Sequence, residues 1–580
     1  WLAGWAAPQI GWPGRVGALS NLTFGGFVMA GLSLLTIFLA GFPILTLVMN
    51  SLTVEKDGAA FFSFQNYAAL LRNPRVAAGV VNTLIVALGT AALASFAGVT
   101  LAWINARTNS AAKRFLEPLN LIPFYLSPLI LAVGWMFLAS PRMGLINKFF
   151  VNTLGFGAPP FDIYSMPGII WVMGISFTPY MYLFTIGSLQ KMDPALEDSA
   201  RTTGASMLRT TLTITIPLAT PSILFGFLLT FITSAGLFSV PAVLGVPAQI
   251  GTLPVLVYEA IENSKGSFSL ASATGMILFV LTVFLIFAQR WLIAGRDYTT
   301  VTGKGYRPSV VDLGRWRWAA FGFNLLYLAA GVFLPLGVLF LVSISNSWHG
   351  HFDPSRVTLA NYAWVLFEFP LTRDAIQNSL FLSAVGATVA VGLSLVISYV
   401  LVRQSGRFRD VLDFFVNLPV SVPGIVFAMG ILVAYIKTPI YGTIWIMMLA
   451  YVTRYLPVST RNTMAVMLSV SEELEQSSRM CGATWLRTLV RVSWPLIKAG
   501  ALAAWLTLFL IYMRELNSSI LLFSEGNEVM SIALYVILQD SPLPHVAAYS
   551  FIQCALVLAA VTLFRRWMGT GELGGGGSAT

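Results

Sequence analysis

The segment DPALEDSARTTGASMLRTTLTITIPL, residues 193–218, returns in altered form 278 positions later as SEELEQSSRMCGATWLRTLVRVSWPL, residues 471–496. Identical residues recur at the same places in both copies: Glu197 and Glu475, Gly204 and Gly482, Leu208-Arg209-Thr210 and Leu486-Arg487-Thr488, and Pro217 and Pro495. Each copy is a polar, basic stretch between long apolar stretches. A chain that repeats its least apolar segment is expected to use that segment for a contact outside the membrane.

The composition is that of a polytopic membrane protein. Of the 580 residues, 57% are apolar and only 10% are charged, and the mean hydropathy is +0.77. Soluble domains carry about 25% charged residues. The net charge of +10 does not indicate nucleic acid binding, because the basic residues lie in short loops, where such charges orient membrane spans. Two cysteines exclude a disulfide scaffold and a cysteine-rich metal cluster.

A membrane-crossing helix needs about 20 mostly apolar residues. We therefore predict an all-α polytopic membrane protein with about 12 transmembrane helices. The predicted spans of the first half are 24–50, 77–105, 117–139, 167–189, 219–241 and 271–293, and those of the second half are 319–345, 377–402, 411–435, 441–460, 497–523 and 546–567. The last stretch, residues 574–580, reads as a cloning remnant and takes no part in this prediction.

The duplication extends beyond the two polar segments. Matching residues recur about 296 positions apart nearer the start of each half: Asn82-Thr83-Leu84 with Asn378-Ser379-Leu380, and Leu121-Ile122-Pro123 with Asn417-Leu418-Pro419. Because each half holds an even number of predicted spans, both enter the membrane in the same sense, as in a parallel duplication. We predict a first half at 1–295 with its polar loop at 191–218, a cytoplasmic linker at 296–318, and a second half at 319–573 with its polar loop at 469–496.

The basic residues also predict an orientation. A cytoplasmic amino terminus places most of the 34 Lys and Arg residues on the cytoplasmic side, as the positive-inside rule requires. Both polar segments then face the cytoplasm. His349, His351 and His545 then fall on the outer side.

Each polar segment has the residues of a short surface helix. Asp193 and Ser471 suit a helix start, and early carboxylates are stabilised by the positive amino end of a helix. Gly204 and Gly482 are placed to end or bend that helix. We expect a short helix roughly parallel to the membrane and joined rigidly to a span on each side, so that it can transmit a push.

These residues resemble the cytoplasmic loop signature of importer-type ABC transporter permeases. In that family the short helix is a coupling helix that seats in the ATP-binding subunit, within a type I importer fold. The resemblance implies coupling roles for nine residues: Glu197, Asp198, Ala200, Gly204 and Pro217 in the first copy, and Glu475, Gln476, Gly482 and Pro495 in the second. The second copy departs from the family pattern, because Gln476 replaces an acidic residue.

The resemblance also implies the partners. The chain lacks the Gly-x4-Gly-Lys-Ser/Thr loop that cradles ATP phosphates, so we expect no enzymatic activity and no cofactor in this chain, with ATP and Mg on separate subunits. Two coupling helices predict two copies of an ATP-binding subunit. A periplasmic substrate-binding protein and the lipid bilayer of a bacterial inner membrane complete the expected partners, and nucleic acid is not among them.

The fusion of two halves in one chain resembles the ferric-iron and thiamine importer permeases. Locally, Met513-Arg514-Glu515-Leu516 resembles a Lys/Arg-Glu-Leu-Pro segment of the ferric-iron group, with Asn517 where that group usually has Pro. Ferric iron is therefore the favoured substrate, and thiamine, a polyamine and an organophosphonate remain as alternatives.

Three residues in a predicted span are candidates for the translocation path: Arg514, Glu515 and Asn517. Charges inside a membrane tend to face a bundle interior or a water path. The alternative is that Arg514 and Glu515 form a structural pair that braces two helices. His349 and His351 have a spacing that permits a metal site, although such a pair in an exposed loop is more often incidental.

Two prolines recur in the third predicted span of each half: Pro123 and Pro128, and Pro419 and Pro423. Proline in a membrane helix frees backbone carbonyls that neighbours must satisfy. We expect a static kink, with a hinge or unwound gate as the alternative.

Two other classes of function remain as alternatives. An ion-coupled secondary transporter also has two parallel six-span halves in some folds, but it leaves the paired polar segments unexplained. A membrane enzyme is disfavoured, because the chain shows no catalytic carboxylate pair, no histidine cluster in the spans and no nucleophile motif.

Overall fold

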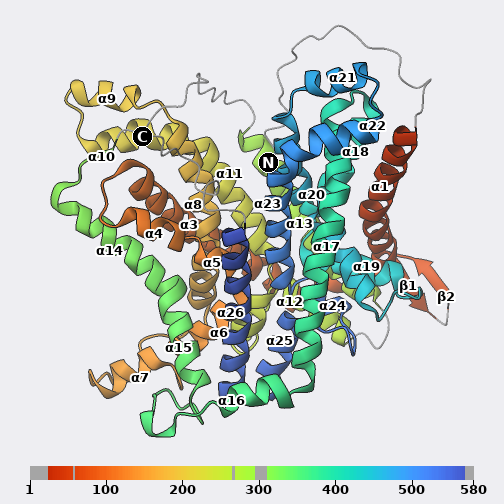
Figure 1. The fold of residues 1–580 in the computed structure, drawn as a ribbon. Helices are drawn as coiled ribbons and strands as arrows, with labels where there is room; N and C mark the ends of the chain where they lie inside the picture. Colours follow the sequence, from red (N-terminus) through yellow and green to blue (C-terminus); the bar gives the residue numbers. More distant parts are fainter. Residues whose placement is uncertain (1–23, 57–58, 264–267, 294–309, 568–580) are drawn as a thin grey trace.

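The computed structural model describes residues 24–56, 59–263, 268–293 and 310–567. Much of the predicted linker at 296–318 and all of residues 574–580 lie outside the described residues, so the predicted boundaries of the halves stay a prediction. The described part is almost entirely helical, which confirms the predicted fold class (Figure 1). One antiparallel hairpin, β1 (Thr53–Lys56) with β2 (Ala59–Phe62), was not predicted and follows the first helix.

Within the described ranges, nine helices are long and apolar enough to cross a membrane, or eleven if each of two bent pairs is one span. The helices that form the straight spans are α1 (Phe24–Ser51), α3 (Pro74–Arg107), α8 (Met166–Lys191), α11 (Ile216–Ala235), α13 (Ser269–Ile293), α14 with α15 (Arg317–Leu328, Leu334–Ser343), α17 (Pro370–Arg403), α23 (Trp494–Met513) and α26 (Leu543–Trp567). The predicted span 441–460 falls on α20 (Ile444–Leu468), which is not among these candidates, because two arginines and several hydroxyl side chains lower its hydropathy.

The two bent pairs lie at the predicted prolines. The helical stretch Phe115–Tyr125, which includes most of α4 (Lys113–Leu119) and α5 (Ile122–Tyr125), meets α6 (Pro128–Ala139) at 100°. The stretch Arg407–Ser421, which includes α18 (Arg407–Asn417), meets α19 (Gly424–Tyr435) at 110°. Because proline forces the preceding residue out of helical geometry, the expected kink is a sharp break in both halves.

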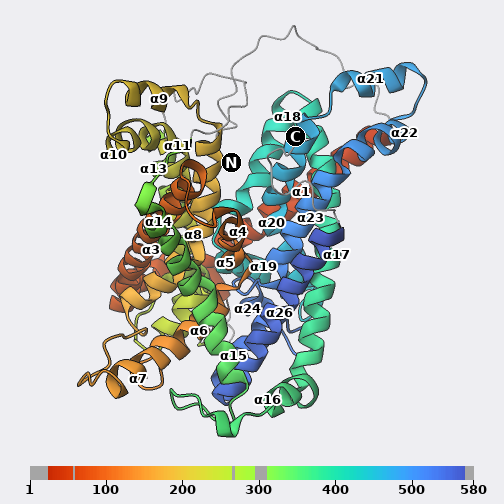
Figure 2. The ribbon, with the colours of Figure 1, turned by 60° about the vertical axis from the view of Figure 1, so that its left-hand side comes forward.

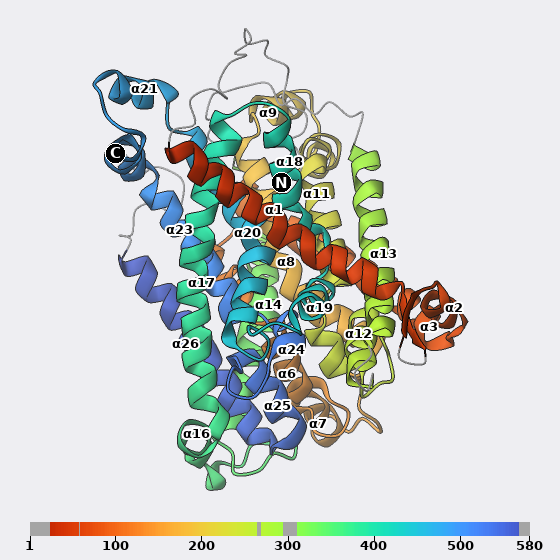
Figure 3. The same ribbon diagram turned by 90° about the vertical axis from the view of Figure 1, so that its right-hand side faces the viewer.

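The first helix of each half packs on the other half. Figure 3 shows α1 running obliquely over helices of the second half, and it contacts α17, α18, α19 and α20. A Cβ on Gly430 of α19 would lie 2.6 Å from the backbone oxygen of Pro43 in α1. In the same way, α15 packs on α6, where a Cβ on Gly134 would lie 2.8 Å from Pro335. The two halves therefore interlock through close backbone contacts that only glycine permits.

Short helices occupy the two ends of the bundle. One end carries α9 (Ala195–Thr202), α10 (Met207–Thr210), α21 (Glu472–Met480) and α22 (Trp485–Thr488), and the opposite end carries α7 (Leu145–Asn152) and α16 (Ala360–Ala363) (Figures 1 and 2). The remaining short helices are α2 (Gln65–Arg72), α12 (Leu253–Glu262), α24 (Ser519–Leu522) and α25 (Met530–Asp540). Both copies of the repeated polar segment thus lie at the same end, which we call the coupling end.

Candidate functional site

The two repeated segments fold alike. Asp193 and Ser471 each accept a hydrogen bond from a backbone N–H two residues later, at 2.9 and 3.3 Å. The eight-residue α9 and the nine-residue α21 follow, and each segment then enters its span through a π-helical turn, Thr211–Thr215 or Leu489–Ser493. Pro217 and Pro495 stand just beyond these turns, in the first turn of α11 and of α23. Each proline lies inside a continuous helix, Met207–Ala235 or Leu486–Met513, where it supplies no backbone N–H.

Gly204 and Gly482 end the two helices in the left-handed region, at φ +87° and +82°. In α9 the N–H of Gly204 donates to the oxygen of Arg201 at 2.9 Å, and the N–H of Ala205 donates to that of Ala200 at 3.0 Å. The bonds after α21 follow the same pattern. This is the Schellman closure, in which glycine takes the left-handed position without strain. The glycines therefore fix the direction in which the chain leaves each helix.

Substituting Gly204 or Gly482 by alanine should disturb the coupling end through backbone strain. A Cβ at either position meets nothing within 4 Å, so the cost of about 1–2 kcal/mol comes from the left-handed conformation alone. We expect each substitution to reduce retention of a bound ATP-binding subunit up to about tenfold, as measured by co-purification. Gly155→Ala is the matched control, because Gly155 has φ +73° and equal space near the opposite end. Equal loss of retention in the control would contradict this account.

The side chains of Glu197 and Glu475 point into the protein. Glu197 accepts a hydrogen bond from Thr215 Oγ1 at 2.6 Å and lies 3.5 Å from Nη1 of Arg107. Glu475 accepts from Ser493 Oγ at 3.0 Å, and its partner is Arg403, with Nη2 at 3.5 Å. Both glutamates are buried. The sequence had suggested coupling roles for them, and the structure places them inside the protein as links between the short helices and the spans.

The other predicted coupling residues lie at the surface of the coupling end. Asp198 and Gln476 are exposed, Ala200 is half-buried, and Pro217 and Pro495 are exposed. Gln476 donates to Glu472 within its own helix at 2.8 Å. The two copies therefore differ in charge at the surface of the coupling end, with an aspartate at position 198 and a neutral glutamine at position 476.

Sequence reasoning missed a set of exposed apolar residues here. Leu196 in α9 is 46% exposed, and its equivalent in α21, Leu474, is 49% exposed. The same 278-residue offset relates two further exposed pairs: Leu208 with Leu486, and Leu212 with Val490. Those four residues lie at the starts of the candidate spans Met207–Ala235 and Leu486–Met513, where apolar side chains can face lipid. Leu196 and Leu474 instead lie on polar surface helices, where a repeated exposed leucine is typical of a contact surface. The repeat offset was the signal that could have found them. We call Leu196 and Leu474 the docking face.

A second group of residues lies where the halves meet, beyond the ends of α11 at Ala235 and α23 at Met513. Arg514 donates through Nη1 to the backbone oxygen of Phe124, and to that of Leu126 at 3.2 Å. Nη2 donates to the Tyr180 hydroxyl at 3.3 Å, and the guanidinium lies over the Phe124 ring at 5.0 Å. All of these partners belong to the first half, so Arg514 bridges the halves at the bend between α5 and α6.

Glu515 does not pair with Arg514, although the structure describes both side chains. Its carboxylate accepts hydrogen bonds from the Tyr455 hydroxyl and, at 2.9 Å, from the Ser518 N–H. The Arg514–Glu515 pair that was considered as a brace between two helices does not form. Arg514 instead contacts the first half, and Glu515 contacts Tyr455 of the second half. Asn517 adds a second bridge between the halves, since its Oδ1 accepts from the Phe238 N–H at 2.9 Å.

Sequence reasoning also missed Arg454 of α20. Its Nη1 donates to the backbone oxygen of Val422 at 3.1 Å. Val422 lies at the bend of the second half and is the equivalent of Leu126 at the 296-residue offset. Each bend is therefore capped by an arginine of the second half. The first half has Ser176 and Gly236 at the corresponding places. An arginine inside a predicted span was the available signal.

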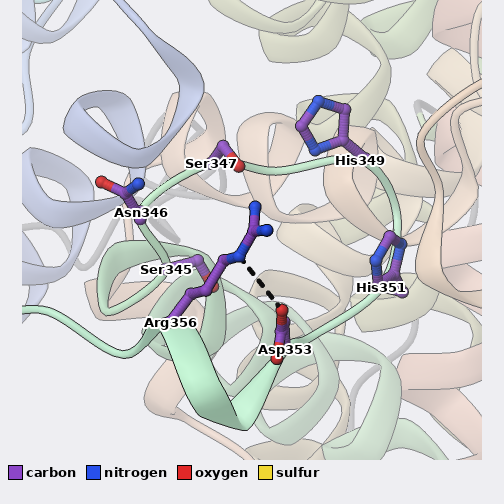
Figure 4. A pocket seen from close by; sticks show the side chains of 7 residues that line it. All are labelled: Ser345, Asn346, Ser347, His349, His351, Asp353 and Arg356. Atoms are coloured by element: carbon purple, nitrogen blue, oxygen red, sulfur yellow. Dashed lines mark ion pairs between the residues drawn. The ribbon is translucent and has the colours of Figure 1, made fainter.

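The histidine pair lies in a small hollow at the opposite end, lined by Ser345, Asn346, Ser347, His349, His351, Asp353 and Arg356 (Figure 4). Asp353 pairs with Arg356 at 3.5 Å, and hydrogen bonds from Ser355 hold the pKa of Asp353 below its ordinary value. In the described part of the chain, no three His, Cys, Asp or Glu residues are grouped so as to hold a metal ion. The geometry therefore gives the suggested metal role no support.

Comparison with known proteins identifies the class of molecule. The family model described as "Binding-protein-dependent transport system inner membrane component" matches residues 94–297 and again 384–570, as expected for a duplicated chain. The ferric transport system permease protein FbpB of Actinobacillus pleuropneumoniae is 26% identical over 454 residues, which are 77% of this chain and 65% of that protein. The putative ferric transport system permease protein FbpB 1 of Haemophilus influenzae is 26% identical over 518 residues, 87% of this chain and 79% of that protein.

A third relative matches only part of the chain. The spermidine/putrescine transport system permease protein PotB of Salmonella typhimurium is 27% identical over 247 residues, which are 42% of this chain and 85% of that protein. One half of this chain thus corresponds in length to most of a separate permease subunit.

Proposed function

Because the chain belongs to the family of inner-membrane components of binding-protein-dependent transport systems, we propose that it forms the translocation path of an importer for ferric iron, driven by two ATP-binding subunits. As a permease of this kind it is a multi-pass inner-membrane protein, and ATP hydrolysis in such systems resides on a separate subunit. The family assignment also disfavours the ion-coupled secondary transporter and the membrane enzyme.

The duplicated coupling helix supports the number of ATP-binding subunits. Two helices with the same glycine closure and matched exposed leucines stand at one end of the molecule. A surface repeated within one chain fits two copies of the same partner. The docking face supplies the apolar contact, and Asp198, Ala200 and Gln476 border it.

The path is proposed to run between the halves near Arg514, Glu515 and Asn517. Arg514 and Asn517 hold the first half through hydrogen bonds at the bend and at Phe238. Alternating access requires the halves to move relative to each other, so these bridges must break and form again during transport. This favours a gating role over a purely structural one.

Ferric iron is favoured by the relatives rather than by a metal site in this chain. Two proteins named as ferric transport permeases align over 77% and 87% of the chain, across both halves. The test is ATP-dependent uptake of radioactive ferric iron into liposomes that contain the chain, its ATP-binding subunit and its binding protein. Uptake of thiamine, spermidine or an organophosphonate in place of iron would reassign the substrate.

The proposed orientation puts the coupling end and the amino terminus in the cytoplasm. Cys481 lies exposed at the coupling end, and Cys554 is buried in α26. We expect a membrane-impermeant maleimide to label inside-out vesicles and to leave intact spheroplasts unlabelled. The Cys481→Ser variant should abolish the signal. Labelling of Cys481 in intact spheroplasts would reverse the orientation.

A further inference from the structure

Two buried ion pairs hold the coupling helices to the spans. Arg107 and Arg403 occupy equivalent positions 296 residues apart, and each is the last residue of its long helix, α3 or α17. Their carboxylate partners, Glu197 and Glu475, lie at the 278-residue offset. The same ion pair therefore appears once in each half, although its two members are far apart in the sequence.

Each ion pair joins three elements. Glu197 lies in α9, Arg107 ends α3, and Thr215, which donates to Glu197, stands immediately before α11. In the second half, Ser493 takes the place of Thr215 at the start of α23. A displacement of a coupling helix is consequently passed to two spans. We call each three-element contact a joint.

The first joint is shielded from water. The side chains of Arg107 and Glu197 are 1% and 3% exposed, against 13% and 4% for Arg403 and Glu475. The Arg107 guanidinium has no hydrogen-bond acceptor within the described part of the chain, so Glu197 is the carboxylate that compensates its charge there. A buried charge that loses its partner is strongly destabilising, and the pair should therefore stay closed while α9 moves.

The chain between the halves reinforces the first joint. Immediately beyond Arg107, the backbone pairs with the linker: Val311 N–H donates to the Arg107 oxygen at 2.8 Å, and Asn109 N–H donates to the Val311 oxygen at 3.2 Å. The Asn109 side chain also bonds Asp312 at 2.6 Å and the Leu313 N–H at 3.0 Å. At the second joint, Arg403 instead donates to the Val470 oxygen at 2.8 Å.

We propose that Arg107 and Arg403 are positioning residues that transmit movement of the coupling helices to the spans, with Glu197 and Glu475 as their partners rather than as contacts of the ATP-binding subunit. Among the described residues, the linker around Val311 braces the first joint and not the second. This inference rests on the proposed function, because it assumes that ATP-binding subunits dock on α9 and α21.

The test uses the complex of the full chain with its ATP-binding subunit and binding protein in liposomes. Uptake and ATP hydrolysis are measured on the same sample. We expect Arg107→Gln and Glu197→Gln to retain the ATP-binding subunits and to lower uptake per ATP hydrolysed about tenfold. The double variant should be no worse than either single one, since both remove one interaction. Arg409→Gln, at an exposed position of α18, is the control.

A second variant guards against a failure to fold. Arg107→Met combined with Glu197→Met removes both charges, and such replacements of buried pairs often preserve stability. We expect this variant to assemble but to stay about tenfold below the unmodified chain in uptake per ATP, because methionines lack both the attraction between the charges and the hydrogen bond from Thr215 to Glu197. Normal coupling in the assembled double variant would overturn the proposal.

The outcomes separate this inference from the proposed function. Loss of the ATP-binding subunits from Glu197→Gln would show that Glu197 contacts the partner, and would contradict the joint while leaving the importer assignment in place. Failure of the unmodified chain to bind any ATP-binding subunit would instead contradict the proposed function.

Discussion

Replacing Arg514 with glutamine is expected to lower ATP-driven uptake at least tenfold while the ATP-binding subunits stay bound. Arg514 bridges the halves through the backbone oxygens of Phe124 and Leu126 and through Tyr180. Buried acceptors that lose their donor cost about 1–3 kcal/mol each. Each 1.4 kcal/mol shifts an equilibrium about tenfold, so the state in which the halves are bridged should lose most of its population.

Three variants give this prediction its controls. Arg514→Lys keeps the charge but cannot serve two carbonyls and a hydroxyl in the same fork geometry, so we expect an intermediate uptake. Arg454→Gln removes the cap of the equivalent bend and should also reduce uptake. Arg409→Gln, at an exposed position of α18, should leave uptake unchanged. Normal uptake by Arg514→Gln would remove this residue from the gate.

Introducing aspartate at both Leu196 and Leu474 is expected to release the ATP-binding subunits. These leucines are 46% and 49% exposed on α9 and α21. Full burial of a leucine contributes about 1.5–3 kcal/mol. Because about half of each side chain is already buried, the contact adds roughly 0.7–1.5 kcal/mol, which corresponds to about threefold to tenfold in affinity at each helix. A carboxylate buried in the same contact adds a further cost. Co-purification of the subunits with the chain measures the effect.

The single variants separate the two helices. Leu196→Asp should free one subunit and leave the other bound to α21, and Leu474→Asp should do the reverse. Phe367→Asp changes an exposed apolar residue near α16, at the opposite end of the molecule, and should retain both subunits. Full retention by the double variant would mean that the docking face is not where the subunits bind.

Hydropathy and the internal repeat predicted most of the fold. Eleven of the twelve predicted spans correspond to apolar helices or bent pairs of the described chain. The twelfth, on α20, is too polar to qualify because Arg454 and Arg461 lie within it. The hairpin of β1 and β2 escaped notice because its strands are only four residues long. Packing of α1 on the second half is a long-range contact, and local sequence patterns do not encode it.

The repeat located the candidate site better than it assigned roles within it. The offset found Gly204 and Gly482, and their left-handed geometry explains why glycine stands there. The inward direction of Glu197 and Glu475 depends on Arg107 and Arg403, which lie about 90 and 70 residues earlier in the chain. Adjacent charges at Arg514 and Glu515 suggested a pair, but consecutive side chains beyond a helix end can face opposite ways, and here they do.

We propose that one chain carries two sites for the same ATP-binding subunit. Native mass spectrometry of the complex purified with its ATP-binding subunit tests it most directly. We expect a mass equal to one chain plus two ATP-binding subunits, falling to one subunit in Leu196→Asp and in Leu474→Asp. A complex of the unmodified chain with a single ATP-binding subunit, or with none, would contradict it.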